Sequence, residues 1–256
     1  MSNPEEVLRQ AVARAVKMLD DSIGKLVDAR NKVCQGATPA APLLSERTLC
    51  WLRNRLGVCV DDIRMWTAHD FVNGSVGEVI RRLVRVRNLI ANNVITYVCR
   101  GAGCGGGCDA DDWAYVCLVD PDNCPTQKTI VHLCHNFWED RNGFGDALHK
   151  ELQALAIIHE ASHLYHCTSD RPGSTVGVAY CLVELVAVMN GISLDGAFLE
   201  NCVRSRRCGP PADCPQAEVA GLGFIAGPTR IFKAAFNPQK AVRLKGSPAM
   251  RTKDRM

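Results

Sequence analysis

The sequence predicts an α+β fold in which several helices are followed by a small sheet and then by two more helices. Apolar residues recur every three or four positions before residue 92, which is the period of one buried helix face. Short runs rich in Val, Ile, Thr and Tyr lie between residues 94 and 134, separated by Gly, Asp, Asn and Pro. The helical period returns after residue 146. Helices and strands that are segregated along the chain favour α+β over a wound parallel sheet.

The first helix is predicted to begin at Pro4 and to end before Gly36. Asn3 supplies a side-chain cap, Pro4 suits the first turn, and Glu5 and Glu6 lie near the positive end of the helix dipole. One face of this helix is apolar and is expected to be buried; it consists of Leu8, Val12, Ala15, Leu19, Ile23 and Leu26.

Two shorter helices are predicted in the same part of the chain. The Pro-rich stretch 38–42 ends the first segment, and a helix over Ser45 to Gly57 follows it. Its buried residues are expected to be Leu49, Leu52 and Leu56. Ser75 and Glu78 form the pattern of a capping box, which predicts a helix that continues through Val79, Ile80, Leu83 and Ile90.

Three strands and two helices are predicted after residue 92. The strands are expected at residues 94–99, 113–119 and 129–134. A helix is expected from Asp146 to His166 and another from Thr175 to Asn190. The second of these helices should bury Val178, Leu182, Leu185 and Val186.

Composition divides the chain further. We take residues 1–92 as an N-terminal helical part, 93–205 as the part with the strands and final helices, and 206–256 as a basic, irregular tail. Residues 230–256 hold eight Lys or Arg and one Asp, a balance of +7, so the total of +3 leaves −4 for residues 1–229. This total is too small to indicate a nucleic-acid partner. The tail is interpreted either as a solvated end or as an arm for an anionic partner.

The cysteine content points to an oxidising compartment. The chain has 14 cysteines, an even number that is high for a reduced compartment without metal. The first thirty residues contain several acidic residues and show no signal peptide, so the expectation of secretion comes from the cysteine content and not from the N-terminus. No apolar run approaches the roughly 20 residues that a membrane-spanning helix needs. We therefore expect no membrane partner.

The strongest functional signal is the pair His159 and His163, with Glu160 directly after the first histidine. Residues four apart lie on one face of a helix, so two imidazole nitrogens can converge on one zinc ion beside the carboxylate. With seven His in 256 residues, roughly 0.007 accidental matches to the pattern are expected. The alternative is a buried helix with two hydrogen-bonded histidines. We interpret His159 and His163 as zinc ligands and Glu160 as the general base.

A catalytic zinc site also needs a third protein ligand. Asp170 follows the helix after a short turn and offers a carboxylate oxygen. Glu184 lies on the next predicted helix, and His166 lies at the end of the first one. The residues alone leave these three alternatives open.

The chain resembles the deuterolysin and peptidyl-Lys metalloendopeptidase family, the aspartate-completed zincins, chiefly from Ile95 to Asn201. His159 to His163 is similar to the metal-binding pair and base of that family, and Thr168 to Asp170 to its Gly-Thr-x-x-Asp element. Residues 1–92 look like its N-terminal helical part. Segments similar to its strands and cysteines ahead of the metal helix are 96–99, 114–116 and 130–138. The resemblance implies that Asp170 is the third ligand and that residues 93–205 are a zincin-like catalytic part.

The resemblance has two departures. Cys167 replaces the glycine of the element, and one residue is missing between Thr168 and Asp170. A tyrosine that helps to stabilise the oxyanion in the family would fall at position 173, which is Gly173 here. Tyr165 and Tyr180 are the candidates that could substitute.

Six cysteines surround the predicted sheet, and the resemblance implies that most form disulfides. The rival interpretation is a second zinc site, but the spacing of the first three is looser than that of a paired-cysteine zinc site. These residues are Cys99, Cys104, Cys108, Cys117, Cys124 and Cys134.

The sequence therefore predicts a zinc-dependent endopeptidase with a polypeptide substrate. The alternative is a catalytically silent binding module, stabilised by zinc and disulfides, such as an effector or a part of a toxin. The departures around Asp170 and Gly173 keep that alternative open.

Overall fold

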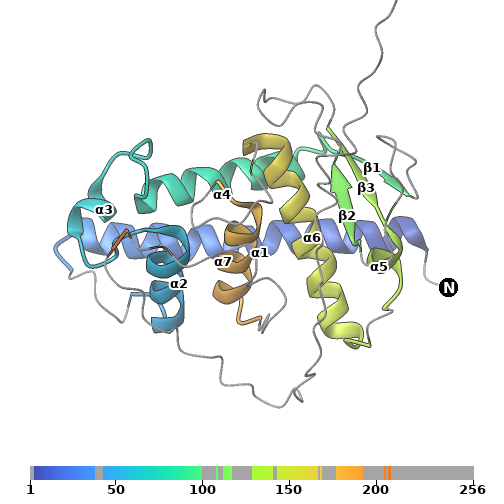
Figure 1. Ribbon diagram of the computed structural model, residues 1–256, viewed down its shortest axis with the longest axis horizontal. Helices are drawn as coiled ribbons and strands as arrows, with labels where there is room; N and C mark the ends of the chain where they lie inside the picture. Colours follow the sequence, from blue (N-terminus) through green and yellow to red (C-terminus); the bar gives the residue numbers. More distant parts are fainter. Residues whose placement is uncertain are drawn as a thin grey trace, which may run out of the picture.

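The fold is α+β, as the order of the predicted elements indicated (Figure 1). The computed structural model describes residues 3–37, 43–99, 108, 112–116, 129–140, 143–166, 168, 177–192, 205 and 207–208, with the side chain of His166 left out. Within these residues the chain forms seven helices and one mixed sheet of three strands. The helices precede and follow the sheet, which confirms the predicted segregation.

The long helix α1 (Pro4–Cys34) runs along most of the structure, and α4, α6 and α7 pack against it (Figure 1). Its start is capped as predicted, because Asn3 Oδ1 accepts a hydrogen bond of 3.0 Å from Glu5 N. The predicted apolar face is the one that packs on the core, although three of its members are only half-buried. The buried apolar residues of the face are Ala11, Ala15, Met18, Leu19, Leu26, Ala29 and Val33, and the half-buried ones include Leu8, Val12 and Ile23.

The remaining N-terminal helices are α2 (Glu46–Leu56), α3 (Ile63–Thr67) and α4 (Val76–Ala91). The capping box at α4 is confirmed, since Ser75 Oγ accepts from Glu78 N at 3.0 Å. The reciprocal bond differs from the usual pattern: Glu78 Oε2 accepts from Gly74 N at 2.7 Å, one residue before the cap. The five-residue helix α3 was not predicted.

The sheet consists of β1 (Thr96–Cys99), β2 (Ala114–Val116) and β3 (Ile130–Leu133), in the order β1-β3-β2. The strand β1 runs parallel to β3, and β2 runs antiparallel to it. All three lie inside the predicted strand ranges. A four-residue helix, α5 (His135–Trp138), follows β3 directly and was not predicted.

The last two helices, α6 (Asp146–His166) and α7 (Ala179–Met189), are central to the fold. All residues of α7 are buried, which explains why its sequence is apolar on every side. The predicted start at Thr175 lies outside the described residues. The core is continuous from Ala11 on α1 to Met189 on α7, so the N-terminal helices and the later part of the chain share one hydrophobic interior.

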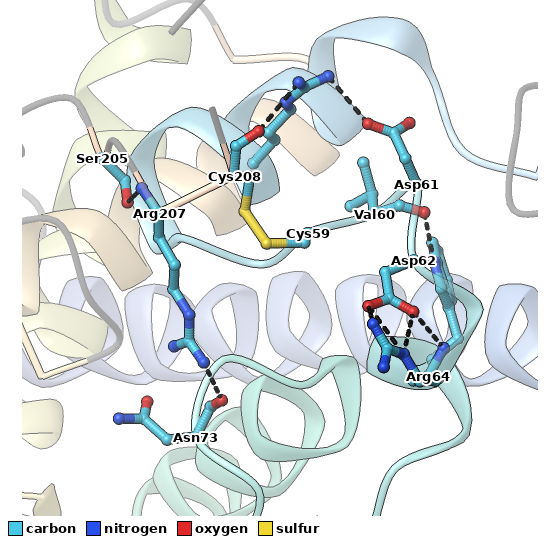
Figure 2. Close-up of a disulfide and its surroundings, with 11 residues drawn as sticks. Cys59, Val60, Asp61, Asp62, Arg64, Asn73, Ser205, Arg207 and Cys208 are labelled. Carbon is cyan, nitrogen blue, oxygen red and sulfur yellow. Dashed lines mark hydrogen bonds and ion pairs between the residues drawn. A yellow bond between two sulfur atoms is a disulfide. The ribbon is translucent and has the colours of Figure 1, made fainter. Parts of the chain in front are cut away.

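A disulfide fixes part of the C-terminal region onto the N-terminal helices (Figure 2). Cys59, after α2, is bonded to Cys208, and Arg53 donates a hydrogen bond to the carbonyl of Cys208 at 3.1 Å. Arg207 donates to the carbonyl of Asn73 at 2.9 Å (Figure 2). Most of the predicted tail, 206–256, lies outside the described residues.

Disulfide bonding near the sheet is also confirmed in part. Cys108 pairs with Cys134, which follows β3, while Cys99 has a free thiol. Cys104, Cys117 and Cys124 lie outside the described residues. Such bonds match the oxidising compartment that the cysteine content predicts. No helix in the described part of the chain is both long enough and apolar enough to cross a membrane.

Candidate metal centre

The rings of His159 and His163 converge on one side of α6. Their Nε2 atoms lie 3.1 Å apart, and the ring planes are nearly perpendicular, at 86°. This arrangement follows from the four-residue spacing on a helix, which places both side chains on one face about one turn apart. The two nitrogens that sequence reasoning selected therefore point toward each other.

A hydrogen bond sets the tautomer of His163. Its Nδ1 lies 2.7 Å from the carbonyl oxygen of Thr168. A carbonyl oxygen can only accept, so Nδ1 carries the proton and donates it, and the lone pair of the neutral ring is on Nε2. That lone pair faces His159. A backbone carbonyl bonded to the far nitrogen is the usual way in which proteins orient a metal-ligating histidine.

Two hydroxyl groups extend this support. Ser162 Oγ donates to the carbonyl of His159 at 2.8 Å and lies 2.8 Å from Thr168 Oγ1. Thr168 Oγ1 is in turn 3.1 Å from His163 Nδ1. Sequence reasoning selected neither Ser162 nor Thr168 as a positioning residue. The sequence did hold a signal for both roles: Ser162 lies between the two histidines, and Thr168 lies just after the end of α6.

The separation of the two nitrogens fits a zinc ion. Two nitrogens 3.1 Å apart, each at the usual distance of about 2.0–2.1 Å from one ion, subtend an angle of roughly 100° at that ion. Tetrahedral coordination needs an angle close to this value. The pair can thus supply two of the ligands of a tetrahedral site.

Glu160 lies beside the histidine pair. Its Oε1 is 4.0 Å from Nε2 of His159. This separation is too long for direct hydrogen bonding, but it can be bridged by one water molecule held near the two nitrogens. The position suits a general base and not a third ligand that replaces the water.

The pair and the glutamate are deeply buried. His159 and His163 are each 2% exposed, and Glu160 is 3% exposed. The ring of Tyr180, from α7, packs against the ring of His159 with centroids 4.6 Å apart. Tyr180 was one of two substitutes considered for the missing oxyanion donor, and it is the one that contacts the pair. Tyr165, the other, is 42% exposed and lies on the outside of α6.

Two of the three candidates for a third ligand have side chains outside the described residues. Asp170 lies outside them, as does the side chain of His166. No three His, Cys, Asp or Glu side chains in the described part of the chain are grouped as a metal site. Glu184 therefore does not complete a trio with His159 and His163.

Glu184 instead belongs to a buried contact between α7 and α2. Its Oε2 accepts a hydrogen bond of 3.1 Å from Nε1 of Trp51. Burial raises the pKa of Glu184 to about 7, although Arg55 and the bond from Trp51 both act to lower it. The carboxyl group is thus about half protonated near pH 7.

Comparison with models of protein families, with curated proteins and with solved structures found no match. The family resemblance rests on the sequence segments named above and stays a prediction.

Proposed function

We propose that this protein is a zinc-dependent endopeptidase in which His159 and His163 hold the ion and Glu160 is the general base. The observation that carries the proposal is the convergence of the two Nε2 atoms, 3.1 Å apart, with Nδ1 of His163 bonded to a backbone carbonyl. Two buried histidines that are hydrogen-bonded only to each other would share this orientation, so measured zinc binding is what separates the two interpretations.

In the proposed reaction the ion and the residues of the chain have different roles. When bound, zinc polarises a peptide carbonyl and lowers the pKa of water. His159 and His163 orient the ion through their Nε2 lone pairs, and Thr168 keeps His163 in the required tautomer. Glu160 accepts a proton from the attacking water and delivers it to the leaving amine.

We propose Asp170 as the third ligand. Glu184 is engaged with Trp51, whereas the carbonyl of Thr168 touches His163 at 2.7 Å. Asp170 is two residues further along the chain, and two peptide units span at most about 7 Å. Asp170 therefore follows, within a short length of chain, a residue that contacts the histidine pair.

The proposed setting is an oxidising, extracellular one. The two disulfides within the described residues, Cys59–Cys208 and Cys108–Cys134, support it. Bonds of this kind persist in secreted proteins and are rare in reduced compartments.

The experiment for this proposal uses an unfolded polypeptide substrate. Purified protein is incubated with it, with and without a zinc chelator, and bound zinc is measured by atomic emission. We expect cleavage that the chelator abolishes and that Glu160→Gln lacks while still binding zinc. Glu151→Gln is the matched control, because Glu151 lies on the same helix and pairs with Arg14 instead.

The deep burial of the three side chains favours a second candidate function. Residues only 2–3% exposed suit a structural zinc site in a silent binding module, which needs no access for a peptide. In that case zinc binds tightly and neither the wild type nor Glu151→Gln cleaves any substrate. A wild-type protein that binds no zinc would contradict both proposals.

The third ligand is tested separately. Asp170→Ala should lose zinc at concentrations that saturate the wild type, and Glu184→Gln should retain it. The reverse result would remove Asp170 from the site.

A further inference from the structure

Two arginines on α4 have no acidic partner within the described part of the chain. The helix carries Arg81, Arg82, Arg85 and Arg87. Arg82 pairs with a glutamate on α4 at 3.2 Å, and Arg87 pairs with an aspartate on α1 at 2.8 Å. Arg81 and Arg85 form no ion pair with any residue that the structure describes. Since residues four apart share a helix face, these two charges lie on the same side of α4.

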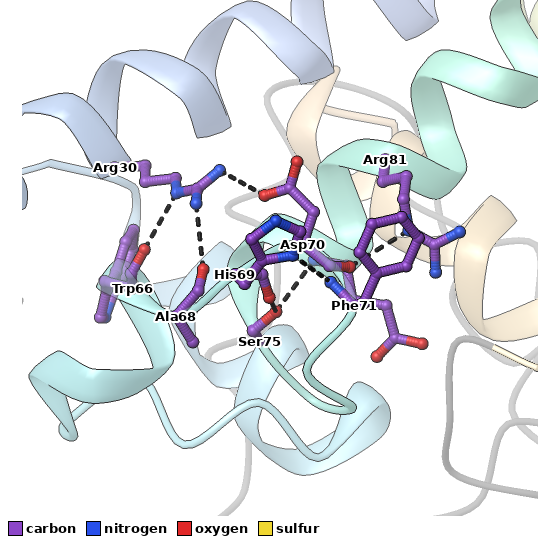
Figure 3. A network of polar contacts seen from close by, with 9 residues as sticks. Arg30, Trp66, Ala68, His69, Asp70, Phe71, Ser75 and Arg81 are labelled. Carbon is purple, nitrogen blue, oxygen red and sulfur yellow. Dashed lines mark hydrogen bonds and ion pairs between the residues drawn. The ribbon is translucent and has the colours of Figure 1, made fainter.

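Each of these two guanidinium groups lies instead over an exposed aromatic ring. The Cζ atom of Arg81 is 4.9 Å from the ring centroid of Phe71, in the loop before α4 (Figure 3). The Cζ atom of Arg85 is 5.4 Å from the ring centroid of Tyr165, near the end of α6. Phe71 is 68% exposed and Tyr165 is 42% exposed. We call these four residues the arginine–aromatic surface.

The terminal nitrogens of both guanidinium groups form no hydrogen bond with the residues that the structure describes. Arg81 donates through Nε to the carbonyl of Asp70 at 3.1 Å (Figure 3). Arg85 forms no hydrogen bond with the described residues. A guanidinium group that contacts a ring through its face can still form bidentate bonds to a carboxylate through its terminal nitrogens.

We propose that the arginine–aromatic surface is a docking site for an acidic polypeptide segment. Arg81 and Arg85 would each bind one carboxylate, and the exposed parts of Phe71 and Tyr165 would contact apolar atoms between them. Two carboxylates about one helical turn apart match the spacing of the two arginines. One member of the surface, Tyr165, belongs to α6, the helix that carries the histidine pair, and it is two residues beyond His163.

An acidic polypeptide segment fits two guanidinium groups better than a nucleic acid does. Nucleic-acid binding depends on many phosphate contacts, and the surface offers only Arg81 and Arg85 among the residues that the structure describes. Two guanidinium groups without an ion pair in the described part of the chain are enough to bind two carboxylates of a short acidic segment.

The test measures binding without cleavage, so its result does not depend on the proposed peptidase activity. The Glu160→Gln protein is titrated against a fluorescent peptide rich in Glu and Asp, and anisotropy is recorded at low salt. A peptide with Gln and Asn in the same positions is the ligand control. Double replacement with Arg81→Gln and Arg85→Gln should weaken binding roughly tenfold. Arg85→Gln alone, which removes no hydrogen bond, should give part of that loss.

The protein control carries Arg9→Gln and Arg64→Gln. It removes the same charge from exposed arginines that are paired with Glu6 and Asp62. Its peptide affinity should stay within twofold of the parent. An equal loss of peptide affinity in both double variants would show that only the net charge of the protein matters, and it would overturn the proposal. A single-stranded oligonucleotide that binds more tightly than the peptide, with the same dependence on Arg81 and Arg85, would also overturn it, as would the absence of saturable binding.

Discussion

Nδ1 of His163 donates a hydrogen bond of 2.7 Å to the carbonyl oxygen of Thr168, two residues past the end of α6. This contact makes Thr168 part of the candidate metal centre. It fixes the proton on the nitrogen that faces away from His159, so the other nitrogen is ready to bind a cation.

The side chain of Thr168 is therefore expected to tune zinc affinity without touching the ion. Thr168→Val keeps the shape and the carbonyl but removes the hydroxyl that lies near His163 and Ser162. Loss of such outer support lowers metal affinity by about tenfold or more, and competition with a chromophoric chelator would measure it. Thr67→Val is the control, because the Thr67 hydroxyl bonds to Ile63 on the exposed helix α3. Equal affinity in wild type and Thr168→Val would contradict the assigned role.

The aromatic ring of Tyr180 is expected to hold His159 in place. The two ring centroids are 4.6 Å apart, and Tyr180 is 1% exposed. Tyr180→Phe keeps the ring and should leave zinc affinity within about twofold, since edge-to-face packing is retained. Tyr180→Leu removes the ring, and we expect a destabilisation of about 1–3 kcal/mol and weaker zinc binding. Chemical denaturation measures the stability of both variants, and the chelator assay measures their zinc affinity. Comparing the two variants separates the contribution of the packed ring from that of the hydroxyl group.

The same Tyr180→Phe protein reports on catalysis. If the hydroxyl of Tyr180 replaces the oxyanion donor that Gly173 cannot supply, kcat should fall while zinc affinity stays unchanged. Unchanged kcat would exclude Tyr180 from that role.

Much of the fold could be predicted because local signals agreed with tertiary packing. Asn3, Ser45 and Ser75 cap the helices that they were expected to begin. Their signals are local, since a side chain bonds to a backbone amide within three residues. The short helices α3 and α5 escaped prediction because five and four residues are too few to show a helical period.

The candidate site was predictable only in its helical part. The spacing of His159 and His163 fixes their relation on α6, because helix geometry is regular. The carbonyl of Thr168 could not be foreseen, since every residue has a carbonyl and only the turn decides where it points. Glu184 was a reasonable alternative from its place on α7. Its bond to Trp51 depends on the packing of α2 against α7, which no local pattern reveals.

The disulfide between Cys59 and Cys208 is expected to stabilise the whole fold. It joins residues separated by 149 positions. Long closed loops give the largest entropic effect, so replacing both cysteines with serine should lower the free energy of unfolding by about 3–5 kcal/mol. Urea unfolding under non-reducing conditions measures the difference. Cys34→Ser is the control, because Cys34 is an exposed free thiol, and it should leave the unfolding midpoint unchanged.

The buried carboxyl group of Glu184 is expected to make stability depend on pH. Burial raises its pKa from 4.5 to about 7, so the folded state holds the proton more tightly than the unfolded state does. The stabilising contribution of this proton is complete below pH 4.5 and is lost as the pH rises through about 7. Glu184→Gln stays neutral at every pH and can still accept the hydrogen bond from Trp51.

Glu184→Gln should therefore match the wild type at pH 5 and exceed its stability at pH 8, by up to roughly 3 kcal/mol. Urea unfolding at the two pH values measures this difference with the disulfides intact. Glu46→Gln, at an exposed position in the first turn of α2, should show no comparable change between the two pH values. A Glu184→Gln protein whose advantage is the same at pH 5 and pH 8 would show that the carboxyl group does not titrate between them. In that case Arg55 would hold Glu184 ionised in the folded protein, and Trp51 would donate its hydrogen bond to a charged carboxylate.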